Sequence, residues 1–399
     1  MPARPPSQRS TPHDLLFALA QVLSVALFVS FAFLMGQWMF SDPGEMGVAG
    51  DFTSFYAASD LALHGRAVDS YSEPPHFAAQ KALFRNQERG YLTFMYPPIF
   101  LLMCLPFALL PFVPMAALWL VGTTAAYAAA IFAVLPRPRH AVLLLAYPAL
   151  FTNAGYGQNG ALSAALLGAA AWALDRRPIL AGVFIGLLAY KPHLGLLLPL
   201  ALAITGRWRA IAAASVTVLL LGAATTLIIG PDIWSSYIGR ADDARRWLES
   251  DDVSYLEKWV SLFGALRLRG VSLTVAYSAQ AVVGLIAALS LLLTLRRRVT
   301  GAALIAGVTA AIPFCAPFLL EYDLLILAVP MAWLMGEGAR TGFRRGEIFV
   351  LAVAYAMPAL FKITAWQNSF KLLVLASSSF LLVSILRRIR AGQAAAAVS

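Results

Sequence analysis

Charged side chains are scarce in this chain. Only 13% of its 399 residues are Asp, Glu, Lys or Arg, while 60% are hydrophobic; an ordinary soluble domain carries about 25% charged residues. Apolar runs of about 20 residues recur along most of the length, as a bundle that crosses a bilayer requires. The scarcity of charge therefore excludes a soluble protein and predicts an all-α, polytopic membrane protein.

Metal-binding and phosphate-binding motifs are also missing. Both cysteines, Cys104 and Cys315, lie inside apolar runs, without CxxC spacing or a neighbouring His/Cys cluster. This excludes a disulfide framework and a zinc site. No Gly-rich phosphate loop is present, so we expect no nucleotide at the site. We expect no cofactor, and the sequence leaves metal dependence open.

Acidic residues are outnumbered, which gives a net charge of +10. The bases gather in short loops between apolar runs, which is the positive-inside pattern of cytoplasmic loops: 137–140, 175–178, 206–209, 296–298, 340–345 and 387–390. A nucleic-acid-binding protein would present its bases on a soluble domain, and none is visible. We expect membrane lipid as a partner and no nucleic acid.

The apolar runs define one integrated transmembrane domain, residues 1–399, with roughly 10–13 spans. The first run, 15–40, follows a basic N-terminus and is too long for a cleaved signal, so it predicts a signal anchor. The others are 94–112, 114–135, 140–155, 158–174, 179–204, 208–229, 272–295, 300–318, 320–336, 347–362 and 369–386.

Two long hydrophilic loops, 41–93 and 231–271, interrupt the runs. The first has seven acids against four bases, which suits the outer face of the membrane. Aromatic and apolar residues within it share helical faces and predict two amphipathic helices at the interface: Phe52, Phe55, Tyr56, Ser59 and Leu63, then Phe77, Lys81 and Phe84.

Topology requires two irregular runs. If every run crossed once, the basic loops at 137–140 and 175–178 would lie outside. Prolines interrupt 94–114, and "YKPH" at 190–193 breaks the run 179–204. Broken helices at membrane depth are tolerated where they line a cavity or are buried in protein. We therefore predict that 179–204 is a hairpin of two short helices with Lys191 near the outer side.

Asp51 and Lys191 are the strongest candidates for chemistry. Asp51, in "GDFTSFYAA" at 50–58, follows a glycine, so it is a helix N-cap, a catalytic carboxylate or both. Lys191 lies too far from the basic loop at 176–177 to reach it easily. A lone ammonium there needs a negative partner, and a lipid phosphate is a suitable one.

Three more polar stretches lie at the ends of apolar runs. The residues Tyr96-Pro97-Pro98 are most simply explained as a rigid helix start. Gln158 and Asn159 are also consistent with a glycine-flanked turn that caps a helix. Glu321, with Asp323, stands at the junction of two runs, where ionisable groups are candidates for function.

These stretches together resemble glycosyltransferase family 87, which includes polyprenol-phosphate-mannose-dependent α-1,2-mannosyltransferases of the GT-C fold class. The resemblance covers about residues 15–335 and rests on four motifs in the same order. They are "DFTSFYAASDLALHGRAVDSY", "YPPIFLLMCLPFALLP", "GQNGALSAALLGAA" and "AGVFIGLLAYKPHLGLLLPLALA…GRWRA".

The resemblance implies a role for each motif. Asp51 matches the catalytic general base of the first outer loop, in a reaction that inverts the anomeric carbon. Lys191 matches the residue that we assign to the donor phosphate. The remaining expected substrate-binding residues are Tyr56, Tyr96, Gln158, Asn159, His193, Glu321 and Tyr322. Many relatives carry a histidine near Glu321, Tyr322 and Asp323, so the substrate preference of this chain is not implied.

We therefore predict a multi-pass glycosyltransferase of the inner (plasma) membrane, with its active site on the periplasmic or outer side. It would move a hexose, mannose being expected, from a polyprenyl-phosphate donor to a glycan or glycolipid acceptor. Three alternatives stay open: a secondary transporter, a lipid-linked glycan ligase or polymerase, and a non-catalytic membrane scaffold.

Overall fold

The computed structural model describes residues 21–22, 24–33, 36–37, 50–83, 90–135, 138–250, 256–296, 298–363 and 367–398. These residues form helices and no named strand, so the protein is all-α, as predicted. Four helical stretches among them are long and apolar enough to cross a membrane: Phe112–Val134, Trp208–Ile229, Leu273–Thr294 and Lys371–Ala394. The chain is a polytopic membrane protein, and some described apolar helices, such as Gly160–Ala173 and Gly301–Cys315, are shorter than the predicted runs 158–174 and 300–318.

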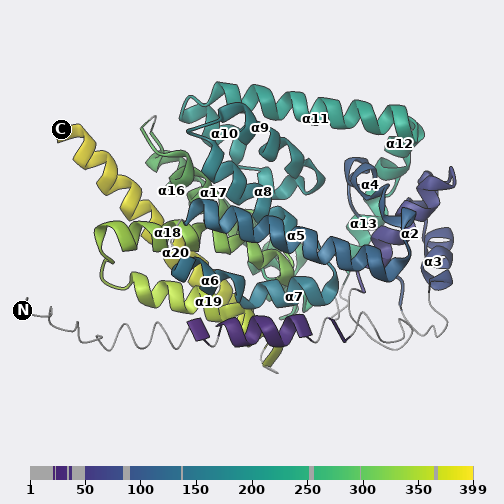
Figure 1. The fold of residues 1–399 in the computed structure, drawn as a ribbon, viewed down its shortest axis with the longest axis horizontal. Helices are drawn as coiled ribbons and strands as arrows, with labels where there is room; N and C mark the ends of the chain where they lie inside the picture. The colour runs from purple at the N-terminus through teal and green to yellow at the C-terminus, as the bar shows by residue number, and fades with distance from the viewer. Residues whose placement is uncertain are drawn as a thin grey trace, which may run out of the picture.

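The α-helices and 3₁₀-helices (η) of the first half of the chain are α2 (Phe52–Leu63), η1 (Ala67–Tyr71), α3 (Glu73–Ala82), α4 (Pro98–Cys104), η2 (Phe107–Leu109), α5 (Phe112–Val134), α6 (Pro138–Leu145), α7 (Pro148–Tyr156), α8 (Gly160–Ala173), α9 (Pro178–Leu187), η3 (Leu188–Tyr190), η4 (Pro192–Gly195) and α10 (Leu198–Ile204). In Figure 1, α2 and α3 lie at one end of the molecule, and α8 lies near its centre.

The second half begins with α11, which runs along one long side of the molecule in Figure 1. Its elements are α11 (Trp208–Ile229), α12 (Asp232–Gly239), α13 (Ala241–Leu248), α15 (Leu262–Arg267), α16 (Leu273–Thr294), α17 (Gly301–Cys315), η5 (Glu321–Leu327), α18 (Ala328–Thr341), α19 (Glu347–Ile363) and α20 (Gln367–Val398).

Helices α8 and α17 form the centre of the bundle, and nearly all residues of both are buried. Around them, glycines let helices approach closely. A Cβ placed on Gly186 of α9 would lie only 2.6 Å from the Cβ of Thr217 on α11. Gly182 makes a similarly close approach one turn earlier. This Gly-x-x-x-Gly spacing is typical of tight helix pairs in membranes, where small residues allow dense packing.

The segment 178–204 is a hairpin, as predicted. Helix α9 ends before Lys191, and α10 begins after two short 3₁₀ turns. An ion pair of 2.6 Å between Asp175 and Arg207 joins the two ends of the segment. The basic loops before and after it therefore lie on the same side of the molecule, and Lys191 lies at the turn between the two halves. The predicted interruption of 94–114 is also observed, since α4 ends at Cys104 and α5 begins at Phe112.

The first long loop differs from the expected interfacial layout. Nine of the 12 residues of α2 are buried, on all sides of the helix. Phe52 contacts Phe107 and Trp119, with ring centroids 5.2 Å and 6.3 Å away, so η2 and α5 cover a helix face that we expected lipid to cover. One predicted interfacial residue, Phe84, lies outside the described residues. Parts of three predicted segments also lie outside them: most of the span 15–40, residues 41–49 of the first loop and residues 251–255 of the second loop.

Candidate active site

One cavity of about 370 Å³ collects most of the polar candidates. It lies where the start of α2, the segment before α4, the α7–α8 turn, the η3–η4 turn, the segment before α15 and η5 meet. We call it the Asp51 cavity. Its charged and polar lining residues include Asp51, Ser54, Tyr96, Gln158, Tyr190, Lys191, His193, Lys258, Tyr322 and Asp323. Residues far apart in the sequence are thus brought to one space.

Asp51 is held at the first turn of α2 by its main chain. Its N–H donates to the carbonyl of Tyr156 (2.9 Å), which ties α2 to the end of α7. Its side chain makes no capping hydrogen bond to the helix. The carboxylate instead accepts a hydrogen bond of 2.9 Å from the Nε2 of Gln158. The side-chain cap that the sequence suggested is therefore not formed, and the carboxylate lines the cavity.

Burial raises the pKa of the Asp51 carboxyl above its ordinary value of 3.8. The hydrogen bond from Gln158 and the positive charges of Lys258 and Lys191 act in the opposite direction, with smaller effects. A carboxylate with a raised pKa is a better proton acceptor than an exposed one, because the basicity of a general base rises with the pKa of its conjugate acid.

Gln158 is positioned by the turn between α7 and α8. Gly157 ends α7 with φ at +72°, a left-handed conformation that glycine adopts without steric cost. The Oε1 of Gln158 accepts a hydrogen bond of 3.0 Å from the hydroxyl of Tyr96. Tyr96, Gln158 and Asp51 therefore form a chain of hydrogen bonds in which the amide fixes the carboxylate.

Lys191 already has a negative partner inside the protein. Its Nζ lies 2.6 Å from Oδ1 of Asp323, and the two side chains are 5% and 1% exposed. Lys191 is therefore not a lone ammonium, because Asp323 neutralises its charge, and its role toward a lipid phosphate stays a prediction. The ammonium also lies 4.7 Å from the ring centroid of Tyr322 and 5.8 Å from that of Tyr96, within the range of cation–π attraction.

Two charged residues of the cavity are absent from the sequence-based set of site residues. Asp323 was noticed beside Glu321 but was not given a role. Lys258 was one base within a mixed-charge loop and gave no signal of its own. In the structure, Lys258 is exposed to solvent and lines the cavity. Its carbonyl accepts a hydrogen bond of 3.2 Å from the N–H of Glu321, which ties this loop to the start of η5.

The structure places three predicted site residues away from the lining. Tyr56 points to the α4–α5 connection, where its hydroxyl donates to the carbonyl of Leu110 (2.8 Å). Asn159 is fully buried at the start of α8, and its carbonyl accepts from Ser163. Glu321 is buried at the start of η5 but does not line the cavity. By contrast, Tyr96, Gln158, His193 and Tyr322 do line it.

Aromatic rings form the wall next to Asp51. The ring of Phe55 lies edge-on to Tyr96 and Phe100, with centroids 5.4 Å and 5.0 Å away. Phe100 in turn stacks on Tyr190 at 5.1 Å. Such a wall is rigid and largely apolar, with hydroxyl groups at its edge. Among the described residues, no group of three or more His, Cys, Asp or Glu side chains is arranged to hold a metal ion.

Comparison with known proteins gives one family. The family model of glycosyltransferase family 87 matches residues 94–317, which is more than half of the chain. The match contains Tyr96, Gln158, Lys191 and Lys258, whereas Asp51 and Asp323 lie outside it. Comparisons with curated proteins and with solved structures gave no match.

Proposed function

The chain belongs to glycosyltransferase family 87 and is a membrane glycosyltransferase, and from its site we propose the reaction. It moves a hexose, expected to be mannose, from a polyprenyl-phosphate donor to a hydroxyl of a glycan or glycolipid acceptor. One observation carries this proposal: Asp51, Lys191 and Lys258 line the same cavity. Transfer from a sugar phosphate needs a base for the acceptor and positive charge for the departing phosphate.

Asp51 acts as the general base in this scheme. Its carboxylate takes the proton of the acceptor hydroxyl while that oxygen forms a bond to the anomeric carbon of the donor. The bond from this carbon to the phosphate oxygen breaks on the opposite side, and the electron pair leaves with the phosphate. A single displacement of this kind inverts the anomeric configuration. The hydrogen bond from Gln158 holds the base in place, and burial supports its basicity.

Lys191 and Lys258 face the phosphate as it gains charge. An ammonium group has three N–H donors, and Asp323 takes one from Lys191. The ion pair fixes the Nζ of Lys191 at the cavity wall, so no side-chain freedom is lost when a phosphate binds beside it. Lys258, at a more exposed position, adds a second positive charge. Both Lys191 and Lys258 line the cavity and supply N–H donors for the phosphate.

A membrane protein also suits a membrane-bound donor. A polyprenyl tail needs an apolar environment, and the exposed apolar side chains of spanning helices such as α11 place lipid beside the protein. We place the site on the periplasmic or outer side of the inner membrane, because the loop that carries Asp51 is acidic and the basic loops are expected to be cytoplasmic.

The test supplies purified protein in nanodiscs with radiolabelled polyprenyl-phosphate sugars, one hexose at a time, together with lipid and glycan extracts as acceptors. We expect label from the mannose donor to enter the acceptor fraction and NMR of the product to show an inverted anomeric carbon. Transfer from nucleotide sugars alone would contradict the proposal. Transfer only from a lipid diphosphate glycan would identify a ligase or polymerase. With the protein reconstituted into sealed vesicles instead, label that crosses the membrane unchanged would identify a transporter.

A further inference from the structure

A groove of about 520 Å³ lies between α16, α17 and α20. Its lining on α16 runs from Val283 to Ser290, its lining on α20 runs from Ser379 to Arg390, and Phe314 of α17 completes it. In Figure 1 these three helices lie toward the end of the molecule opposite α2 and α3. We call this space the Arg390 groove.

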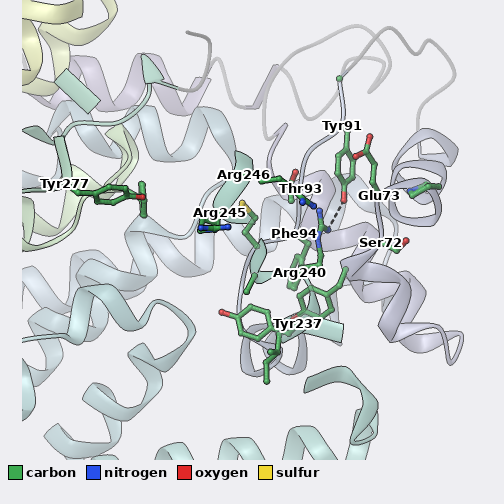
Figure 2. A pocket seen from close by; sticks show the side chains of 17 residues that line it. Ser72, Glu73, Tyr91, Thr93, Phe94, Tyr237, Arg240, Arg245, Arg246 and Tyr277 are labelled. Atoms are coloured by element: carbon green, nitrogen blue, oxygen red, sulfur yellow. Dashed lines mark hydrogen bonds between the residues drawn. The ribbon is translucent and has the colours of Figure 1, made fainter. Parts of the chain in front are cut away.

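The groove is separate from the cavities around the candidate active site. Figure 2 shows the larger of these cavities, about 1280 Å³, with Arg240, Arg245 and Arg246 among its side chains. That cavity shares Tyr91 and Tyr237 with the Asp51 cavity, so it belongs to the catalytic region. None of the described residues that line the Arg390 groove lines either cavity.

Helix α20 connects the catalytic region to the groove. Near its start, the ammonium of Lys371 donates to the carbonyl of Trp259, a residue that lines the Asp51 cavity. Arg390 follows 19 positions later in the same helix, which corresponds to about 28 Å at about 1.5 Å per residue. The hydrocarbon core of a bilayer is about 30 Å thick. The arginine end of the groove therefore lies at the membrane surface opposite to the Asp51 cavity.

The basic loops lie at this same end of the bundle. Arg207 donates a hydrogen bond of 2.9 Å to the carbonyl of Val299, just after α16, and forms an ion pair with Asp175. Asp175 in turn accepts a hydrogen bond of 2.7 Å from the N–H of Gly301. The loops that contain Asp175 and Arg207 therefore meet the chain that leaves α16. We expect this side to be cytoplasmic, because basic loops concentrate there.

Two arginines, one helical turn apart, line this end of the groove. The Nε and Nη2 atoms of Arg390 lie 3.3 Å and 3.1 Å from the Oγ1 of Thr294, which holds the guanidinium against the end of α16. Neither Arg387 nor Arg390 forms an ion pair with an acid in the described part of the chain, and Glu347 pairs with Arg388 instead. A guanidinium has five N–H donors and binds phosphate oxygens with two parallel hydrogen bonds.

The rest of the groove is mainly apolar and about one leaflet long. Beyond the arginines it is lined by side chains such as Ile286 on α16 and Leu382 and Leu386 on α20. Ser379 and Arg390 are 11 positions apart in α20, which corresponds to about 16 Å. Half of the hydrocarbon core is about 15 Å. The groove therefore has the length of an acyl chain that lies in a single leaflet.

We propose that the Arg390 groove binds an anionic glycerophospholipid of the leaflet beside the basic loops. Its phosphate lies on Arg387 and Arg390, and one acyl chain lies between α16 and α20. Basic pockets between membrane helices on the cytoplasmic side bind such headgroups. The proposed sugar donor does not explain the arginines, because its tail is uncharged and its phosphate lies in the Asp51 cavity. A lipid that binds only the folded protein also stabilises it.

The test uses the full chain in phosphatidylcholine nanodiscs that contain a small fraction of phosphatidylglycerol with a photoactivatable diazirine on its acyl chain. Proteolysis and mass spectrometry locate the adducts after irradiation. Phosphatidylcholine with the same diazirine chain is the headgroup control. Well below saturation, we expect the phosphatidylglycerol probe to label 283–290 and 379–387 about tenfold or more above the control. Label on α12 and α13 belongs to the cavity in Figure 2 and is not counted.

Two arginine variants test the headgroup contact. Arg387→Gln/Arg390→Gln should lower labelling of the groove by phosphatidylglycerol about tenfold or more. Arg176→Gln/Arg209→Gln is the matched control, because it removes the same charge from two exposed positions on the same side of the protein. Labelling of the groove in this control should equal that of wild type.

A third variant tests the acyl-chain contact while both arginines remain. Ser290→Phe should fill part of the groove and lower the labelling. Leu289→Phe is its matched control, because Leu289 is 47% exposed and does not line the groove. Thermal unfolding in neutral nanodiscs identifies any variant that is not folded, and the headgroup comparison on the wild-type protein decides without the variants.

Four results would overturn the inference: equal labelling by the two headgroups, an equal loss in the Arg176→Gln/Arg209→Gln control, full labelling of folded Ser290→Phe, and absence of adducts in the groove. If adducts are absent and native mass spectrometry shows a dimer, a second copy of the chain covers the groove. Sugar transfer enters none of these measurements, so the inference stands or falls independently of the proposed reaction.

Discussion

The buried pair of Lys191 and Asp323 offers a way to separate a structural role from a catalytic one. The Nζ of Lys191 lies 2.6 Å from the Oδ1 of Asp323, and both side chains are almost fully buried. Removal of one partner leaves an uncompensated charge, which costs about 3–5 kcal/mol in buried pairs. We therefore expect Lys191→Met and Asp323→Asn each to lower the free energy of unfolding by about this amount. The double variant Lys191→Met/Asp323→Asn should be more stable than either single variant, because no charge remains unpaired.

The assay combines thermal unfolding in nanodiscs, followed by tryptophan fluorescence, with the KM for the lipid-phosphate donor. The double variant should recover stability but keep a raised donor KM, since it lacks the ammonium. The pair of Arg388 and Glu347 is a matched control, because both side chains are 4% exposed and neither lines the Asp51 cavity. Arg388→Met should lower stability without a specific change in the donor KM.

Two results would refute this reasoning. If the free energy of unfolding falls by less than about 1 kcal/mol in both single variants, the pair behaves like a hydrated surface pair. The two side chains would then not be buried. If the double variant restores the donor KM to the wild-type value, Lys191 does not bind the donor phosphate. The first result concerns the structure of the pair, and the second concerns its function.

Three further predictions concern neighbouring features. Gln158→Leu should move the acidic limb of the kcat/KM profile to higher pH, because the hydrogen bond from Gln158 lowers the pKa of Asp51 and its loss raises that pKa. An acidic limb at the wild-type pH would show that Asp51 does not set it. Burial lowers the pKa of His76 from 6.5 to about 4, so unfolding should cost roughly 3 kcal/mol less at pH 4 than at pH 7. The loss from His76 should begin as the pH falls below 6.5, and the total loss of stability should be smaller by about this amount in His76→Gln, which unfolding curves across this range will check. Gly186→Val should lower the Tm, because its side chain would overlap Thr217; a Tm equal to that of wild type would contradict the close packing of α9 and α11.

Local sequence patterns predicted part of this architecture well. The break at Lys191-Pro192 was recognised because a lysine and a proline in mid-run are incompatible with a continuous membrane helix. The hairpin also followed from the charge of the flanking loops, and the ion pair between Asp175 and Arg207 bears it out. Asp51 and Lys191 were singled out from position and charge alone, and the structure brings both to one cavity. Their roles stay predictions.

Long-range contacts account for what the sequence did not predict. Asp323 neutralises Lys191 although the two residues are 132 positions apart in the chain, and no local sequence pattern predicts such a pair. Helix α2 has the aromatic stripe of an interfacial helix, but Phe107 and Trp119, more than 50 residues later, cover the side that we expected to face lipid. Tyr56 was expected at the substrate, but its hydroxyl donates a hydrogen bond to the carbonyl of Leu110, 54 positions later.

The most direct test of the central claim is a single-turnover measurement on Asp51→Asn. A positioned general base contributes about 10²–10⁴-fold to a rate. We therefore predict a loss of sugar transfer of this size, with donor affinity within a few-fold of wild type and an unchanged Tm. Asp60→Asn is the matched control, since Asp60 lies on the same helix, is 46% exposed and does not line the cavity. Transfer by Asp51→Asn at a rate close to that of Asp60→Asn would contradict the assignment of Asp51 as the base.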